Sequence, residues 1–506
     1  MLQTLILGLV LAPVTVPAPQ DGVSPLPAKP DVLFIAVDDL NDWITPLGGH
    51  PQARTKNFER LARMGMCFTN AHCAAPACHP SRIAVMTGVH PSRSGIYRNS
   101  FHQRGPEWRK ASPVLKDVTT ISQHFRENGY RAVGAGKIYH ALQWTKGSQN
   151  DPATWDEFWP DALSPIPTWV RPKLVPDAER GIGTGRPLGN RQLFGAAPLD
   201  VPDSATSDYQ VVDWAISQLA KPATGPLFCA LGLFRPHIPW EVPRRYFEQH
   251  PLDGIKLPIH KEGDLADTFG HARTGWHRWV QANGLWDDLV QGYLASIAYS
   301  DAQLGRLLDA VEKSPRRDNI IIVLWSDHGM HIGEKENWEK FTLWEESTRV
   351  PLFVAVPGQT GGRRCAQPVS LTDLFPTLCD LCGLPTPAQC DGKSFDAQLA
   401  DPKTRRARPA LTSFWMHNHK GVAKSDRPVL GHALRDERWR YIHYSNGFKE
   451  LYDHKQDPGE HQNLAARPEH AETIRRLGRF VPAKASPPVR GGSYLKRPAV
   501  RKRKLP

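Results

Sequence analysis

Short apolar runs alternate with helical patterns along most of the chain, and this alternation indicates the fold class. The apolar runs are rich in β-branched residues, as buried strands are, and lie at residues 31–37, 226–234, 319–326 and 351–358. Stretches with helical periodicity fall between them, at residues 119–130, 207–220 and 291–314. Strands that alternate with helices are typical of α/β proteins. We therefore expect a large, mostly parallel central sheet flanked by helices.

The pattern changes near residue 408, where short alternating strands such as HALRDERWRYIHY follow one another. An amphipathic helix near residues 471–480 closes this region. We expect a catalytic domain over residues 28–400 and a smaller α+β subdomain on an antiparallel sheet over residues 401–481. Residues 144–202 are rich in Pro, Gly and Trp, which predicts long surface loops.

The two ends of the chain differ from its body. Residues 2–12 form an apolar run too short to span a bilayer, which predicts a secretory signal peptide over residues 1–20 and a periplasmic or secreted protein. A tail with a chance apolar patch is the alternative. No other segment could cross a membrane. Residues 482–506 read as a basic disordered tail, and this tail holds eight Lys and Arg of a chain whose net charge is +12. The remaining charge of about +4 gives no reason to invoke nucleic acid.

Cysteine is scarce, with eight residues in the whole chain, so disulfides do not build the fold. Cys379 and Cys382 have the spacing of a zinc site, but they fall on an amphipathic helix that ends at Gly383. Burial of both thiols on one helix face is the favoured interpretation, and zinc is the alternative.

Polar pairs follow two of the expected strands. Asp38 and Asp39 come directly after VLFIAV, and Asp327 and His328 come after IIIVLWS. Ligands of parallel α/β sheets collect at the carboxyl ends of the strands, so both pairs could face one crevice. Three carboxylates in one crevice would repel one another unless a cation neutralised them, and a hard divalent cation suits such ligands. For either pair alone, a turn or a helix N-cap is the alternative.

A third candidate site is the stretch CHPSRIAVMTG, residues 78–88. Pro80 favours the first turn of a helix that begins near Cys78, and a helix start favours an anion. Arg82 adds a fixed fork of donors for oxyanions. A thiolate would be an odd ligand for a calcium-like ion, because such ions prefer oxygen.

This stretch resembles the signature of the type I sulfatases, Cys-x-Pro-Ser-Arg followed by an apolar run that ends in Thr-Gly. The resemblance implies an alkaline-phosphatase-like fold and a formylglycine made from Cys78 by a formylglycine-generating enzyme, so that oxygen replaces sulfur at this position. It also implies one divalent cation, Ca²⁺ with Mg²⁺ as the alternative. The metal ligands it implies are Asp38, Asp39, the residue made from Cys78, Asp327 and His328.

The similarity continues along the chain. GAGKIYH supplies Lys137 and His140, LFRPHIPW supplies His237, and the segment after Asp327 supplies Lys340. In the family, the residues matching Arg82, Lys137 and Lys340 hold the sulfate. By the same resemblance, His237 protonates the leaving group, and His140 removes a proton so that sulfate is released.

The pair Asp327-His328, in place of the more frequent Asp-Asn, resembles the iduronate-2-sulfatase branch. We therefore expect a sulfated saccharide or glycosaminoglycan fragment as the substrate. Three alternatives remain open: a phosphodiesterase or phosphonate monoester hydrolase of the same superfamily, a non-catalytic binder of sulfated glycans, and a protein that binds anionic polymers through its basic tail.

Overall fold

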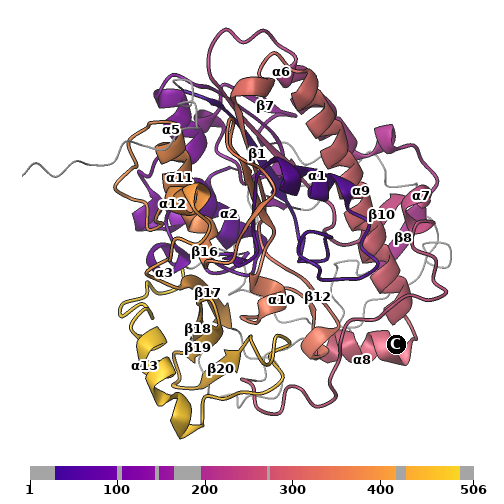
Figure 1. Ribbon diagram of the computed structural model, residues 1–506, viewed down its shortest axis with the longest axis vertical. Coiled ribbons are helices and arrows are strands. Elements are labelled where there is room, and N and C mark those ends of the chain that lie inside the picture. Colours follow the sequence, from indigo (N-terminus) through magenta and orange to yellow (C-terminus); the bar gives the residue numbers. More distant parts are fainter. Residues whose placement is uncertain are drawn as a thin grey trace, which may run out of the picture.

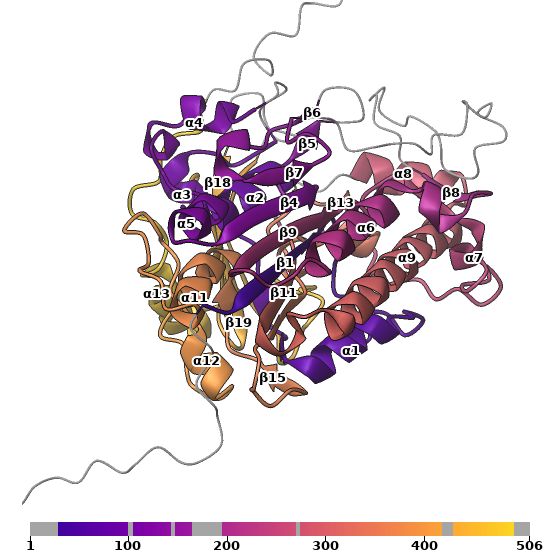
Figure 2. The ribbon, with the colours of Figure 1, turned by 90° about the horizontal axis from the view of Figure 1, so that it is seen from above.

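The central element is one large sheet whose strands are parallel with a single exception. The computed structural model describes residues 29–99, 105–142, 147–163, 195–269, 274–416 and 429–489. Within these residues, the sheet has eight strands (Figures 1 and 2), in the order β15 (Arg363–Cys365), β2 (Met66–Phe68), β14 (Leu352–Ala355), β11 (Ile320–Ser326), β1 (Asp31–Val37), β9 (Leu227–Leu233), β4 (Arg131–Gly136) and β7 (Glu157–Trp159). Only β14 runs against its neighbours.

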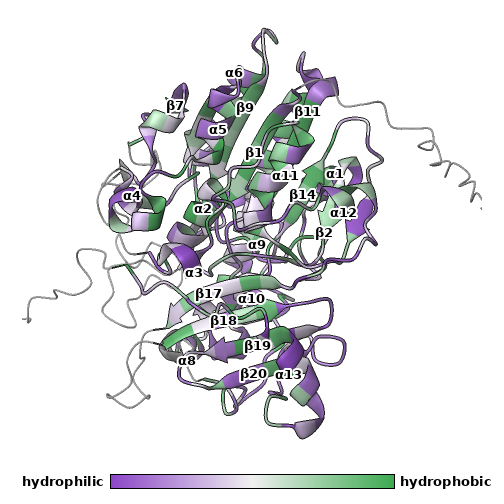
Figure 3. Cartoon of the chain, turned by 90° about the vertical axis from the view of Figure 1, so that its left-hand side faces the viewer, coloured by the Kyte–Doolittle hydropathy of each residue, from purple (hydrophilic) through white to green (hydrophobic). Residues whose placement is uncertain are grey.

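Helices cover both faces of the sheet, which explains why β1, β9 and β11 are apolar along their whole length (Figures 2 and 3). Alternate residues of β1 enter two separate apolar clusters: Leu33 and Ile35 face one side, and Val32 and Phe34 face the other. The first side is covered by α1 (Lys56–Met64), α6 (Ser207–Leu219) and α9 (Trp286–Lys313), and the second by α2 (Cys78–Thr87), α5 (Ile121–Glu127) and α11 (Leu374–Leu381).

A second, antiparallel sheet forms the C-terminal subdomain at one end of the molecule (Figure 1). Its strands are β17 (Ala410–Met416), β18 (Val429–Arg435), β19 (Trp439–Tyr444) and β20 (Lys449–Asp453), and α13 (Ala471–Gly478) packs on it. Leu343 and Trp344 of the catalytic body belong to the apolar cluster of this sheet. The expected α/β architecture with an antiparallel subdomain is confirmed.

Two expectations are wrong in part. Residues 157–159, expected to lie in surface loops, form the edge strand β7, because parallel pairing with β4 satisfies their backbone. Residues 482–489, expected to be disordered, run along the catalytic body. There, Ser486 Oγ donates to the carbonyl of Arg93 (2.6 Å), Tyr97 Oη donates to the carbonyl of Ser486 (2.8 Å), and Val489 packs against an apolar cluster. The sequence of this segment is rich in Pro and Ala, and backbone pairing with residues distant in sequence holds it.

The long helix, the cysteine pair and the N-terminal segment were also subjects of prediction. The helix expected over residues 291–314 begins earlier, at Trp286. Cys379 and Cys382 lie in an apolar cluster with Cys365, and the groups of described residues that could hold a metal do not include them. The predicted signal peptide, residues 1–20, lies outside the described residues. Within the described residues, no helix combines the length and the apolar character needed to cross a membrane.

Candidate active site

Four neighbouring parallel strands deliver the site residues to one edge of the sheet. Lys137 follows β4, Asp38 and Asp39 follow β1, and Asp327 and His328 follow β11. His237 lies a few residues beyond β9, which separates β4 from β1. The sheet order therefore explains how residues as far apart as Asp39 and Asp327, 288 positions, meet. Lys340 reaches the same place from the segment after β13 (Trp338–Glu339). The carboxyl edge of such a sheet is the usual location of a ligand.

The helix α2 brings Cys78 to this edge. Cys78 is its first residue, and all ten residues of the helix are buried. Ser81 Oγ donates to the carbonyl of Asp327 (2.6 Å), which ties the first turn to the end of β11. The side chain of Asn99 accepts from the amide of His79 (2.9 Å), one of the amides that a helix start leaves unpaired. Cys78 Sγ lies 3.2 Å from His328 Nε2.

Three cations face three buried carboxylates. Arg82 Nε donates to Asp327 Oδ2 (2.7 Å), and its Nη2 donates to Asp38 Oδ1 (3.2 Å). Lys137 Nζ also pairs with Asp38. Lys340 Nζ lies 2.7 Å from both carboxylate oxygens of Asp39. Formal charges thus balance in a region with almost no solvent exposure, as buried ions require.

The pKa values of the three carboxyl groups diverge. Burial by itself would raise the pKa of Asp38, but Lys137, His237 and Arg82 outweigh it and hold this pKa well below its usual range. At Asp39, burial is likewise outweighed, mainly by His237 and Lys340, and the pKa is lowered. At Asp327, burial exceeds the effect of Arg82, and the pKa is raised. One buried cluster therefore contains two carboxyl groups with a lowered pKa and one with a raised pKa.

The thiol of Cys78 is held in its neutral form. Burial, followed by the charge of Asp38, raises the pKa of this thiol well above its ordinary value, against the opposing effect of Lys340. The thiolate is the nucleophilic form of cysteine. An unmodified Cys78 is therefore a poor nucleophile at neutral pH.

The imidazoles have defined orientations. His328 Nδ1 lies 3.0 Å from the carbonyl of Gly329, and His237 Nδ1 lies 2.6 Å from the carbonyl of Ile238. A carbonyl can only accept, so both rings carry a proton on Nδ1 and direct Nε2 into the site. His237 Nε2 is 3.9 Å from Asp39 Oδ2. Burial lowers the pKa of His237 to about 3, against the opposing effect of Asp39.

His140 lies beside this cluster, with its ring centroid 6.0 Å from that of His79. Burial, then Lys137 and His79, lower the pKa of His140 well below its usual value. Every predicted site residue is thus found in or next to one buried cluster.

The donor set fits a divalent cation. Ligand atoms of Asp38, Cys78, Asp327 and His328 lie within 4.8 Å of one another, as do those of a second group that contains Asp39. Buried carboxylate oxygens are the preferred ligands of hard cations. His328, with Nδ1 bound to a backbone carbonyl and Nε2 directed toward the carboxylates, has the arrangement common in metal-binding histidines.

Several residues that shape the site carried no signal in the sequence. Tyr293 Oη, from the middle of α9, donates to the carbonyl of Asp39 (2.8 Å) and accepts from the amide of Asn41 (2.9 Å). In the sequence, Tyr293 looks like an ordinary tyrosine of a buried helix, so its role at the site could not be predicted. Asp39 has φ of 60°, a left-handed conformation that is rare for a non-glycine residue, and this turns its amide toward Asp327 Oδ1 (3.2 Å).

The loop that carries Lys340 contains four non-glycine residues with positive φ: Lys335, Glu336, Glu339 and Phe341. Lys335 anchors this loop to the C-terminal subdomain. Its buried Nζ donates to the carbonyl of Glu460 (2.5 Å) and lies 3.3 Å from Asp264 Oδ2. The ammonium also lies 5.0 Å from the ring centroid of Trp344. The subdomain therefore holds the backbone that positions Lys340.

This fold and site define a hydrolase of the alkaline-phosphatase-like class. The chain belongs to the sulfatase family: the family described as Sulfatase matches residues 30–384, and that described as N-sulphoglucosamine sulphohydrolase, C-terminal, matches residues 333–484. The enzyme is a sulfuric ester hydrolase of the iduronate-2-sulfatase-like kind. The second match begins at Gly333, so it includes both the Lys340 loop and the subdomain that anchors it.

Named relatives extend this result. A sulfatase of Formosa agariphila is 35% identical over 480 residues, covering 90% of this chain and 86% of the relative. Iduronate 2-sulfatase of Homo sapiens is 30% identical over 418 residues, covering 73% of this chain and 72% of the relative. A delta 4,5-hexuronate-2-O-sulfatase of Bacteroides thetaiotaomicron is 26% identical, covering 88% and 86%.

Solved structures share the fold at lower identity. A phosphonate monoester hydrolase of Agrobacterium radiobacter has a TM-score of 0.68 and 22% identity, covering 89% of this chain and 94% of that one. A 2-O GAG sulfatase has a TM-score of 0.65 and 21% identity, covering 89% and 90%. The expected fold, family and reaction class are confirmed.

Proposed function

We propose that this sulfatase removes sulfate esters from a uronic-acid-containing saccharide outside the cytoplasm. The observation that carries the proposal is the arrangement at Cys78, where one helix start faces three carboxylates, His328 and three cations. Two relatives named for 2-sulfates of uronic acids support the substrate class. Export follows from the predicted signal peptide.

Two groups complete the site in this proposal: a formylglycine made from Cys78 by a formylglycine-generating enzyme, and one divalent cation, Ca²⁺ with Mg²⁺ as the alternative. When present, the formylglycine supplies a hydroxyl nucleophile in place of the thiol, and the cation supplies positive charge that stabilises negatively charged oxygen atoms. Asp38, Asp39, Asp327, His328 and the modified residue 78 would hold the cation.

The cationic side chains bind the sulfate. Lys137 and Lys340 neutralise Asp38 and Asp39 in this structure. A cation held by those carboxylates would release both ammonium groups to the sulfate oxygens. Arg82 stays fixed by Asp327 and by the carbonyl of Ile138 (3.3 Å), so it contributes a constant positive charge. Preorganised charges of this kind stabilise the charge that develops on the sulfate oxygens.

The histidines move the protons. His237 directs Nε2 into the site, and an approaching anionic sulfate ester favours the protonated ring, which then donates to the leaving oxygen. In this proposal His140, whose ring centroid lies 6.0 Å from that of His79 in the first turn of α2, accepts a proton from residue 78 so that sulfate is released. The overall reaction converts one ester and one water into one alcohol and one sulfate.

The test uses purified protein co-expressed with a formylglycine-generating enzyme. Mass spectrometry of the peptide around residue 78 measures conversion, and kcat/KM is determined for 2-O-sulfated uronate disaccharides, 6-O-sulfated hexosamines and a phosphonate monoester. We expect the highest kcat/KM on a 2-O-sulfated uronate, and its loss after chelation with recovery in Ca²⁺. A higher kcat/KM on the phosphonate would overturn the proposal, as would full activity of a protein with an unconverted thiol.

A further inference from the structure

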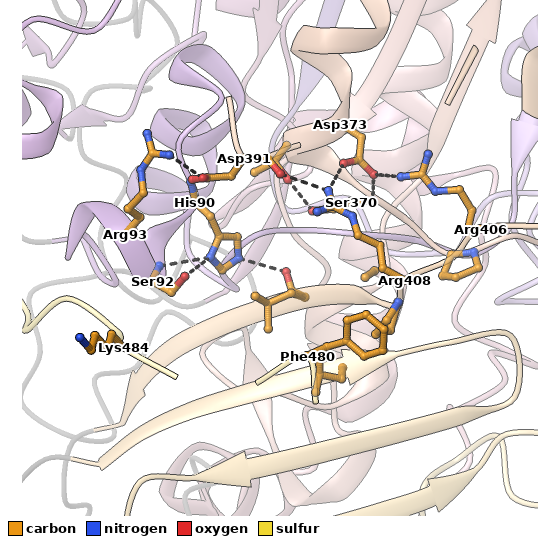
Figure 4. Close-up of a pocket in the computed structure, with 16 residues that line it drawn as sticks. His90, Ser92, Arg93, Ser370, Asp373, Asp391, Arg406, Arg408, Phe480 and Lys484 are labelled. Carbon is orange, nitrogen blue, oxygen red and sulfur yellow. Dashed lines mark hydrogen bonds and ion pairs between the residues drawn. The ribbon is translucent and has the colours of Figure 1, made fainter. Parts of the chain in front are cut away.

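A cavity of about 380 Å³ lies where the catalytic body meets the C-terminal subdomain, and the catalytic residues do not line it (Figure 4). His90, just beyond α2, forms part of one wall, and Phe480 and Lys484, beyond α13, form part of another. The ten residues of α2 separate it from Cys78, a distance of about 15 Å along the helix. Its volume is in the range of ligand pockets.

The wall contains more positive than negative charge. Two carboxylates face four cations, which are Arg93, Arg406, Arg408 and Lys484. Both carboxylates are already occupied by donors. Asp373 accepts from the amides of Ser370 (3.0 Å) and Lys393 (2.8 Å) and pairs with Arg406 and Arg408, as Figure 4 shows in part. Asp391 accepts from Arg93 (2.6 Å) and from the amide of His90 (2.8 Å).

Two of the four cations keep open donors. Arg408 uses only Nη2, toward Asp373 Oδ1 (3.1 Å) and the carbonyl of Asp391 (3.2 Å). Its Nε and Nη1 make no hydrogen bond with any described residue. The ammonium of Lys484 has no ion pair or hydrogen bond within the described part of the chain either. Unpaired guanidinium and ammonium donors bind carboxylate and sulfate oxygens.

The same cavity has an apolar side. Phe480 leaves 38% of its surface exposed, and Leu411 and Leu434 also line the cavity. Figure 4 draws Phe480 and Arg408 among the residues that line this one cavity. An exposed ring and open cationic donors in the same cavity suit a ligand with an apolar face and an anionic substituent. An acidic pyranose has both.

We propose that this cavity is a second, non-catalytic binding site for an acidic sugar residue of a saccharide chain, with Arg408 and Lys484 on its carboxylate or sulfate and Phe480 against its ring. This proposal rests on the proposed function for the kind of polymer concerned. The site would retain the enzyme on a polyanionic chain, and charge contacts of this kind weaken with salt.

The test measures binding without turnover. Full-length protein carrying Cys78→Ala is titrated with a size-defined heparin octasaccharide by calorimetry, alone and with Arg408→Gln plus Lys484→Gln. The control is Lys116→Gln plus Lys403→Gln, which removes the same charge from exposed lysines elsewhere. We expect Kd to rise at least fivefold in the Arg408/Lys484 variant and less than twofold in the control. Equal changes in the two variants would show general charge attraction only and would overturn the proposal.

Two further measurements separate a loss of binding at the cavity from a loss of folding or of catalysis. Lys484→Gln by itself removes no described contact, so it tests the cavity even if Arg408→Gln weakens the fold. With the cysteine restored, kcat/KM on 4-nitrophenyl sulfate should be unchanged in both variants, because the cavity lies away from Cys78. A protein that binds the octasaccharide through this cavity but hydrolyses no sulfated saccharide would refute the proposed function and leave this inference standing.

Discussion

Replacing Lys335 by methionine tests whether the C-terminal subdomain positions the catalytic lysine. Methionine retains most of the apolar stem beneath Trp344 but removes the ammonium from between Asp264 and the carbonyl of Glu460. Asp264, whose side chain is fully buried, then keeps His461 Nδ1 (3.1 Å) as its remaining ion-pair or hydrogen-bond partner among the described residues. Breaking a buried ion pair in this way costs about 3–5 kcal/mol.

This cost is comparable to the strain in the loop. Each of the four non-glycine residues with positive φ stores of the order of 1–3 kcal/mol, which the surrounding contacts must hold in place. Without its anchor, the loop relaxes and Lys340 leaves its position beside Asp39. We expect kcat on 4-nitrophenyl sulfate to fall by at least tenfold in Lys335→Met, with a clear drop in Tm.

Three comparisons separate positioning from a general loss of stability. Lys335→Arg should recover part of kcat, because it restores the positive charge. Lys403→Met, at an exposed lysine, should leave kcat and Tm unchanged. The double variant Lys335→Met/Lys340→Met should be no slower than Lys340→Met, because both changes remove the same interaction. If the two losses in kcat instead multiply, Lys335 does not act through Lys340.

Three further outcomes follow from the structure. Cys78→Ser and Cys78→Ala should both lose turnover by at least 1,000-fold in kcat, an order of magnitude typical of a lost nucleophile, with Tm close to that of the wild type; full activity of either variant would exclude position 78 as the nucleophile. His237→Ala should lower kcat/KM more for alkyl sulfates than for 4-nitrophenyl sulfate, whose leaving group needs no proton, and equal losses would exclude an acid role. Burial raises the pKa of Asp301 to about 6, although the amides of Phe58 and Asn57 donate to it. The folded state therefore holds a proton that the unfolded state loses above its ordinary pKa of 3.8, so stability falls as pH rises from about 4 to 6. In Asp301→Asn, Tm measured over this range should lose that part of the slope, and an unchanged slope would show that Asp301 ionises normally.

The sequence predicted the site residues better than it predicted the structure around them. Asp38, Asp39, Asp327 and His328 could be predicted to lie together because each pair follows an apolar run typical of a buried strand. Cys78 and Arg82 could be predicted because Pro80 favours a helix start and the stretch resembles the sulfatase signature. Tyr293 and Lys335 could not be found in the same way, since a tyrosine within an apolar helix and a lysine in a charged loop are ordinary features.

Errors arose where backbone pairing decided the structure. Residues 157–159 lie within a Pro-, Gly- and Trp-rich stretch typical of loops, yet they form β7 because the edge of β4 was available. The segment 482–489 is rich in Pro and Ala, yet backbone contacts with α3 (Pro91–Ser94) and Gly95 hold it on the surface. Neither partner is near in sequence, so local composition could not reveal the pairing.

The sequence by itself determined the class of fold, the chemistry of the residues at the strand ends and the family to which the chain belongs. Periodicity, residue type and order along the chain are local properties, and these conclusions depend on nothing else. The tertiary structure decided which charges face one another. It paired Lys137 with Asp38 and Lys340 with Asp39, set the pKa values of the three carboxyl groups apart, and joined the Lys340 loop to a distant subdomain. Electrostatic energies depend on distance and burial, and both arise only when the chain has folded.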